Sequence, residues 1–445
     1  MCNLPLNGVR IVDLSRVFAM PYAGGFLADL GAEVIRVEAC HLPDSRLQLH
    51  ALPENEPGDD WWERSGTFHT LNRGKRSLTL DLRDEGAQQI LRDLIAISDI
   101  TIENYTPRVT RRFGLDYQNL RKIKPDVIAV SNTGYGHSGP WSLYGGVAAT
   151  MEPTHGSSAF MSYGGLPSKI GNSYTDFIAA WTAVFAVMAG LIHRSRTGRG
   201  LWVDLAMYQV GAAFAGEGIL DFALNGKRQR HIGNRHRSFA PHGCYPCKGL
   251  DEWVVLAVQN DSQWADFCQV IGMPQLVSDP RYIDIANRYG RQDEIDVLIK
   301  EWTQCRDKYL IMNQLQNLGI PCGPVLKTKD LFKDPHYKER NFFETASHSK
   351  NSKMGRRKYL GRGWRFSRIN FQDRRPGPEL GEANNYILEE LLNVPSGQID
   401  RLRELGIIGR MPVDTKAPHP LSLNRQKELG WIQATDQNYQ RFNDN

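Results

Sequence analysis

Residues 8–14 of the chain, GVRIVDL, form a short apolar run that is typical of a buried strand. Residues 21–30 follow with helical spacing and stop at Gly31, a residue suited to end a helix. Residues 33–38, EVIRVE, alternate in polarity and predict a second strand. The opening of the chain therefore predicts a strand–helix–strand unit, the connection that joins two parallel strands of one sheet.

The same order of elements returns further along the chain. Residues 77–82 and 100–102 have strand patterns, and residues 85–98 between them have a helical one. Residues 127–131 predict one more strand. Strands that alternate with helices favour a parallel sheet covered on both faces, so we predict an α/β fold with a doubly wound, Rossmann-like large domain.

The composition of the chain changes near residue 226, and a length of 445 residues favours more than one domain. We predict a large domain over residues 1–225 and a smaller α/β domain over 226–335. Residues 336–445 then return to the large domain. The tail from about residue 412 is polar and rich in proline, which predicts an extended arm or disorder.

Composition excludes several classes of protein. Hydrophobic residues make up 41% and charged residues 23% of the chain, as in ordinary soluble proteins. The net charge of +5 is scattered, which argues against nucleic acid but suits an anionic substrate. We expect no membrane partner and a cytoplasmic location, because we find no bilayer-spanning run and no room for a signal peptide before the first strand.

Cofactor and metal signatures are weak. The seven cysteines include one CxxC, residues 244–247, with no second pair, so we predict no metal site and reduced thiols. A dinucleotide site needs a glycine-rich turn after the first strand, and residues 15–25, SRVFAMPYAGG, have no glycine at that turn. We therefore predict no permanently bound cofactor.

The most informative carboxylate is Asp176, at the end of residues 170–176, IGNSYTD. Residues 177–192 after it are apolar and predict a helix buried on nearly every side. One interpretation of Asp176 is an N-cap, because backbone N–H groups lack partners at a helix start and the dipole favours an anion. The other is a nucleophile, since a carboxylate in dry surroundings suits attack on an activated acyl group. The two roles are compatible.

Asp176, its apolar helix and residues 194–207, RSRTGRGLWVDLAM, together resemble the family III CoA-transferases. That family includes formyl-CoA and carnitine CoA-transferases and, as a branch, the α-methylacyl-CoA racemases. The resemblance extends from Leu6 to about Gly409. It implies a transferase that moves CoA from an acyl-CoA donor to a carboxylic acid acceptor, with coenzyme A as substrate. It also implies that Asp176 is catalytic and forms an aspartyl anhydride and then an aspartyl-CoA thioester.

The resemblance further implies an interlocked homodimer, or a heteromer with a related subunit, and a set of CoA contacts. Cations in residues 72–80, NRGKRSLTL, suit phosphate, although a solvated turn is the alternative. Residues 103–108 follow a parallel strand, at the edge where open α/β sheets bind ligands. The predicted CoA contacts are Val17, Phe18, Arg73, Lys75, Leu80, Asn104, Tyr105, Thr106, Arg112 and Met207. Taken alone, Met207 favours core packing.

Two departures from the family pattern matter. Many members carry Arg where this chain has Ala39, at the nucleotide end of CoA; Arg36, His41 and Arg46 are the candidates to compensate. The racemases place a His about thirty residues before the Asp, where this chain has residues 146–147, Gly-Val.

The nearest histidines, His137 and His155, are displaced from that position along the chain. Racemisation needs a second base, so transfer is favoured. A 2-methylacyl-CoA racemase and a non-catalytic acyl-CoA-binding protein remain as alternatives.

The sequence gives only an indication of which acids donate and accept CoA. A basic cluster precedes the smaller domain and predicts either a second carboxylate on the substrate or a solvated basic turn. Its members are Arg228, Arg230, His231, Arg235, His236 and Arg237. Succinyl-CoA is the preferred donor on this basis.

Overall fold

The computed structural model describes residues 4–41, 46, 51–163, 166–168, 170–171, 173–350, 352–369, 371, 374–417 and 419–443. The chain divides into two compact units. The first combines Met1–Ser158, Lys169–Lys227 and Lys338–Asn445, and the second combines Ala159–Ser168 with Arg228–Tyr337. The first unit thus contains both ends of the sequence, with the second inserted between them.

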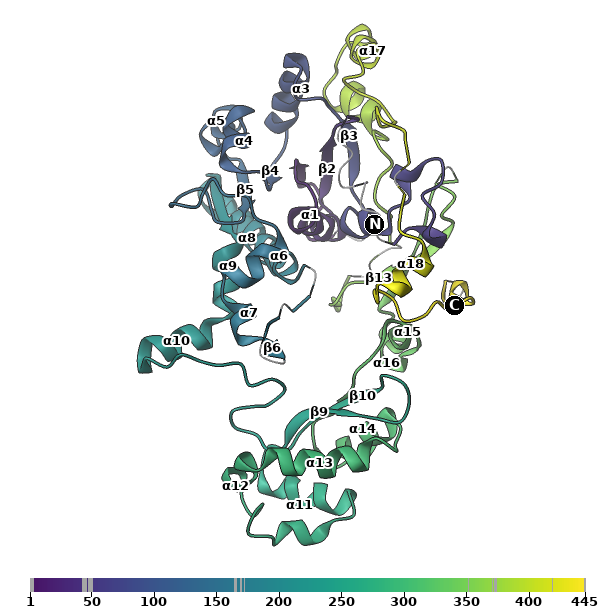
Figure 1. Ribbon diagram of the computed structural model, residues 1–445. Helices are drawn as coiled ribbons and strands as arrows, with labels where there is room; N and C mark the ends of the chain where they lie inside the picture. Colours follow the sequence, from purple (N-terminus) through teal and green to yellow (C-terminus); the bar gives the residue numbers. More distant parts are fainter. Residues whose placement is uncertain are drawn as a thin grey trace. The chain divides into compact units, whose positions relative to one another are not determined.

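A six-stranded sheet is the centre of the first unit (Figure 1), with the strand order β3-β2-β1-β4-β5-β8. Every neighbouring pair in this sheet is parallel, which confirms the predicted α/β class with a parallel sheet. The strands are β1 (Arg10–Asp13), β2 (Glu33–Glu38), β3 (Arg76–Thr79), β4 (Ile100–Glu103), β5 (Ile128–Thr133) and β8 (Leu201–Ala206). Strand order reverses between β1 and β4, and the carboxyl ends beside such a switch are where open α/β sheets bind ligands.

Helices cover both faces of this sheet. On one face α1 (Ala19–Asp29) packs against α8 (Tyr174–Thr197), and buried side chains such as Leu27 and Val187 complete that core. On the other face α3 (Glu85–Ala96) shares a core with η4 (Tyr386–Leu391) and α17 (Ser396–Glu404). The remaining helices of this unit before residue 228 are α2 (Gly66–Leu71), α4 (Pro107–Arg112), α5 (Tyr117–Ile123), α6 (Ala148–Thr154), α7 (Ser157–Phe160), α9 (Met207–Phe214) and α10 (Gly216–Asn225). Burial of each large aliphatic side chain contributes about 1.5–3 kcal/mol.

Helix α8 is less buried than its sequence predicts. Ala179, Ala183 and Val187 face the core, but Trp181 is 43% and Phe185 75% exposed. The small residues let α8 approach α1 closely, while Phe185 points outward. The expectation of burial on nearly every side is therefore wrong for the single chain. By length and composition alone, α8 is also apolar enough to cross a membrane, which the sequence analysis did not expect.

The C-terminal part, Lys338–Asn445, belongs to the first unit. Strands β12 (Phe343–Ser347) and β13 (Arg356–Leu360) form an antiparallel pair. The tail contains α18 (Leu423–Glu428) and contacts an earlier loop: the Trp61 indole N–H donates to the carbonyl of Thr415 at 3.2 Å. The Asn55 side-chain amide likewise donates to the carbonyl of Leu421 at 3.1 Å. The tail thus lies along an earlier loop, whose side chains supply these contacts.

The second unit has an antiparallel sheet in the order β11-β10-β9. Its strands are β9 (His242–Pro246), β10 (Trp253–Ala257) and β11 (Cys322–Pro324), and its larger helices are α11 (Asp261–Val270), α13 (Gln292–Thr303) and α14 (Lys308–Gln316). Trp264, Phe267 and Ile299 are buried in a core of its own. A core of this kind indicates a cooperative unit.

Candidate functional site

Asp176 lies in the first turn of α8, three residues after Ser173, which is the N-cap. The interpretation of Asp176 as the cap is therefore wrong, since the helix begins at Tyr174. Its carboxylate instead accepts a hydrogen bond from the backbone N–H of Ala19, the first residue of α1. Two helix N-termini meet at one carboxylate, and both favour a negative charge there.

The surroundings of Asp176 are nevertheless dry. Burial raises its pKa most, the Ala19 N–H opposes that rise and the charge of Glu152 adds to it, which brings the pKa to about 6. Beside it the Phe177 ring packs edge-on against Phe18 and Tyr22, with centroid distances of 6.1 and 4.9 Å. At neutral pH the carboxyl group is mostly ionised yet poorly solvated, a state that suits a nucleophile.

Helix α6 supplies two buried polar side chains next to this turn. Glu152 is fully buried, and its Oε1 accepts a hydrogen bond from the Tyr174 backbone N–H at 3.2 Å. His155 Nε2 lies 3.0 Å from the Thr175 hydroxyl. Its ring presses on α9, where a Cβ at Gly211 would lie 2.1 Å from the imidazole. These contacts fix the start of α8, and burial keeps the pKa of His155 below its usual range.

The loop after β1 brings some of the predicted CoA contacts together. Val17 is 47% exposed and adopts a left-handed backbone conformation, with φ of 64°. Asn104, at the end of β4, fixes this loop in both directions. Its Oδ1 accepts from the Arg16 backbone N–H, and its Nδ2 donates to the Arg16 carbonyl, each at 2.7 Å. Asn104 therefore holds the loop in place, and Val17 and Phe18 connect it to Ala19.

Two predicted phosphate contacts lie elsewhere. Lys75 Nζ is buried, 2.5 Å from Asp13 Oδ2 and 2.8 Å from the carbonyl oxygen of Pro21. Arg73 is also buried, with Nε 2.7 Å from Asp29 Oδ2. Both cations tie α1 to the strands, so the structure contradicts the prediction that they bind phosphate. Turn residues with this charge were expected at the surface, and only the fold reveals their acidic partners.

A cavity of about 210 Å³ lies at the carboxyl edge of the sheet, over the ends of β1 to β4. Ala39 and His41 line it, so the position where the family carries Arg faces this cavity. Arg16 and Arg83 line it too, and Arg83 Nη2 lies 2.5 Å from Asp81. The rim of the cavity therefore carries Arg16 and the Arg83–Asp81 pair around apolar walls.

The three candidates to replace the missing arginine differ in whether a ligand can reach them. Arg46 is fully buried and paired with Glu38 at 2.9 Å and Glu63 at 2.7 Å, so it is not available to a ligand. Arg36 lines the cavity but is 2% exposed. His41 reaches the cavity and pairs with Asp81 at 3.4 Å.

The other predicted CoA contacts lie in three places. Leu80 and Tyr105 line the cavity at the sheet edge, and Thr106 is the N-cap of α4 close by. Arg112 is exposed at the end of α4, with its guanidinium 5.6 Å from the Phe113 ring centroid. Met207 is 6% exposed in the apolar core, as its residue type alone indicates.

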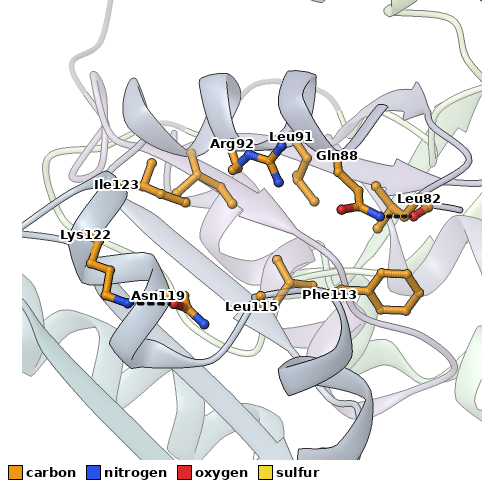
Figure 2. A pocket seen from close by; sticks show the side chains of 11 residues that line it. Leu82, Gln88, Leu91, Arg92, Phe113, Leu115, Asn119, Lys122 and Ile123 are labelled. Carbon is orange, nitrogen blue, oxygen red and sulfur yellow. Dashed lines mark hydrogen bonds between the residues drawn. The ribbon is translucent and has the colours of Figure 1, made fainter. Parts of the chain in front are cut away.

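A second cavity, of about 350 Å³, opens between α3 and α5 (Figure 2). Leu91 and Leu115 form part of its apolar lining, and Arg92 and Lys122 also line it. It shares Leu82, Phe113 and Leu115 with the cavity at the sheet edge. None of the predicted site residues lines it.

Sequence reasoning missed Glu152, the role of His155 and the Ala19 N–H. The available signal was a lone acid in α6, a short helix whose other residues are uncharged. Position 155 was considered only as a racemase base. In the structure His155 is bonded to Thr175, while His137 lies 4.0 Å from Glu103, so the two histidines serve different places.

The other clusters predicted from the sequence, the CxxC pair and the basic cluster, give less support for a functional site. In the part of the chain that the structure describes, no group of three or more His, Cys, Asp or Glu side chains could hold a metal ion. Cys244 and Cys247 are free thiols. In the basic cluster of the second unit, Arg235 Nη2 lies 2.6 Å from both Asp293 and Asp296. That cation is therefore neutralised.

Comparison with known proteins identifies the family of this chain. A family model described as CoA-transferase family III matches residues 6–384. The chain belongs to that family. It is 30% identical to the succinate–glutarate CoA-transferase of Agrobacterium fabrum over 87% of this chain and 96% of that protein. It is 31% identical to the succinyl-CoA:glutarate CoA-transferase of Mus musculus, covering 91% and 90% of the two chains.

Among solved structures, a CAIB/BAIF family protein from Brucella suis superposes with a TM-score of 0.77. The two share 30% identity over 87% of this chain and the whole of that one. This member of CoA-transferase family III is therefore an enzyme of the transferase class with the α/β fold of its relatives.

Proposed function

We propose that this enzyme moves CoA from an acyl-CoA donor to an organic acid, with succinyl-CoA as the preferred donor. The observation that carries the proposal is the position of Asp176, a partly buried carboxylate at the meeting point of two helix N-termini. Relatives named for succinyl-CoA, glutarate and citramalate support a dicarboxylic acid as substrate.

In the proposed mechanism the Asp176 carboxylate attacks the thioester carbonyl of the donor. CoA leaves as a thiolate, and a mixed anhydride joins Asp176 to the acyl group. The thiolate then attacks the aspartyl carbonyl, which releases the donor acid and leaves an aspartyl-CoA thioester. The acceptor carboxylate attacks that thioester, and the thiolate released takes the acceptor acyl group from the second anhydride, which regenerates Asp176.

We propose that CoA lies along the carboxyl edge of the sheet. Val17 and Phe18 sit on the loop that leads to Ala19, so they suit the thiol end. Leu80, Asn104, Tyr105 and Thr106 follow along the edge, and Arg112 and Met207 complete the proposed contacts. The cavity beside Ala39 suits the nucleotide end, where Arg16, His41 and Arg83 would take the place of the missing arginine.

We also propose that the enzyme works as a homodimer in the cytoplasm. Support for the dimer comes from large apolar side chains that the single chain leaves uncovered on two helices of the first unit. They are Trp181 and Phe185 on α8, and Leu220 and Leu224 on α10, the last 79% exposed. Patches of this kind are typical of surfaces that bind another protein.

The test of this mechanism is covalent trapping. Acyl-CoA donor without acceptor should leave a CoA-sized adduct on the peptide that contains Asp176, and hydroxylamine should release it. Asp176→Asn should form no adduct and lose at least about a thousandfold in kcat, because no other group replaces the nucleophile. Thermal unfolding of the variant serves as the control for folding. A variant that keeps a tenth of wild-type turnover would rule out a nucleophilic role for Asp176.

A further inference from the structure

Glu152 has no part in the proposed chemistry, yet it is a fully buried carboxylate beside the nucleophile. Its Oε1 accepts the Tyr174 N–H, within the same helical turn as Asp176. Its Oε2 is buried and has no hydrogen-bond partner among the residues that the structure describes. A buried acidic oxygen without a partner is costly for the fold, so a chain that only needed to fasten α8 would be served as well by an amide.

The charges around Asp176 make Glu152 stand out. Helix α9 carries no ionisable side chain apart from Tyr208. Helix α1 carries Tyr22 and Asp29, and the Asp29 carboxylate pairs with Arg73. Helix α6 contributes Glu152 and His155, and burial disfavours a charged form of His155. In the part of the chain that the structure describes, no cation is among the groups that shift the pKa of Asp176, and the Ala19 N–H is the donor that opposes Glu152.

We propose, resting on the mechanism above, that Glu152 is a positioning residue whose negative charge destabilises the free Asp176 carboxylate and so drives its acylation. The repulsion exists only while Asp176 is an anion. It disappears when Asp176 becomes part of a neutral anhydride or thioester, so the covalent states gain relative to the free enzyme. The Oε1 bond to Tyr174 keeps the two carboxylates in a fixed relation throughout.

Glu152→Gln tests this, because the amide keeps an oxygen for the Tyr174 N–H and removes only the charge. In the wild-type enzyme kcat/KM should fall below about pH 6, where Asp176 becomes protonated. In the variant this acidic limb should move roughly 0.5–1 pH unit lower, since one of the two causes that raise the pKa is gone. The plateau should drop only about 2- to 5-fold, because a less basic carboxylate is a weaker nucleophile.

The second readout is the amount of covalent adduct formed with donor alone at pH 8. The Gln variant should hold a smaller fraction of aspartyl-CoA than wild type, a change that a purely structural defect would not produce in folded protein. Glu301→Gln, which removes an exposed charge from α13 of the second unit, is the matched control and should change neither readout. Glu152→Asp keeps the charge, but its shorter side chain draws that charge back from Asp176. The acidic limb of its kcat/KM profile should therefore also move to lower pH, by a smaller amount than in Glu152→Gln.

An acidic limb that stays in place in either folded Glu152 variant would overturn the proposal, as would an unchanged adduct fraction in the Gln variant. If the wild-type enzyme formed no adduct with any productive donor, the proposed mechanism itself would fail. An adduct that forms equally in wild type and Glu152→Gln would refute only the role of Glu152.

Discussion

The role that the sequence predicts for Lys75, a contact to phosphate, differs from the role that it has in the structure. Its ammonium group lies between Asp13, at the end of β1, and the carbonyl of Pro21 in α1. The approach is possible because Gly24 has no side chain: a Cβ there would lie 2.9 Å from Lys75 Nζ. Burial lowers the pKa of Lys75 to about 8, and Asp13 limits the fall. The pair holds the first helix in the position that presents Ala19 to Asp176.

The prediction at this scale concerns Lys75→Met. Removal of one partner leaves Asp13 as a buried charge without its cation, so we expect a loss of about 3–5 kcal/mol in the free energy of unfolding. Chemical denaturation measures that loss. Arg83→Met is the control, because water and salt screen the exposed Arg83–Asp81 pair and its loss should leave stability nearly unchanged. A Lys75 variant with normal stability and a raised KM for acyl-CoA would restore the phosphate role.

Helix α8 is the element on which the site depends, and its two ends are made differently. At the N-terminus Ser173 makes no side-chain cap, and tertiary contacts from α1 and α6 take over. At the C-terminus Gly198 adopts the left-handed conformation, with φ of 68°, and its N–H donates to the Arg194 carbonyl at 2.8 Å. The stop signal is thus local, whereas the start depends on the rest of the fold.

Gly198→Ala tests the local stop. No atom lies within 4 Å of the place where the new Cβ would stand, so the cost comes from the backbone conformation alone, about 1 kcal/mol. Gly216→Ala, in the first turn of α10, also meets open space but has no positive φ. It should leave stability unchanged or raise it by up to about 1 kcal/mol. Equal denaturation midpoints for the two variants would contradict this account of the C-cap.

At the scale of the whole molecule, the apolar side chains left uncovered on α8 and α10 call for a partner surface. Phe185 is 75% exposed although its helix carries Asp176, the proposed nucleophile. If a second copy covers this face, the catalytic helix lies against the subunit interface, and assembly and activity become linked.

We expect light scattering after size-exclusion chromatography to give twice the mass of one chain. Phe185→Glu should shift the enzyme to monomers and lower its activity at dilute concentrations, because a charge cannot be buried in an apolar interface without a partner. Leu250→Glu, at an equally exposed leucine of the second unit, should leave the mass unchanged. A wild-type enzyme that elutes as a monomer at micromolar concentration would contradict the homodimer.

The sequence by itself determined the parallel α/β sheet and the element that carries Asp176. Strand and helix periodicities in residues 8–38 and 77–131 are local patterns, and they predict β1 to β5, α1 and α3 in the order that the structure has, although they miss α4 and α5. The glycine at 198 marks the end of α8 because its backbone conformation is a property of one residue. The resemblance around Asp176 likewise placed the chain in its family, as the comparisons confirm.

Only the tertiary structure decided what the charged residues do. Lys75 and Arg73 look like surface cations in sequence, but Asp13 and Asp29, more than forty residues away, bury them. Ala19 and Glu152 reach Asp176 from separate helices, and spacing along the chain gives no sign of either contact. A charge acts through space and through the dryness of its surroundings, and both depend on which distant segments the fold brings together.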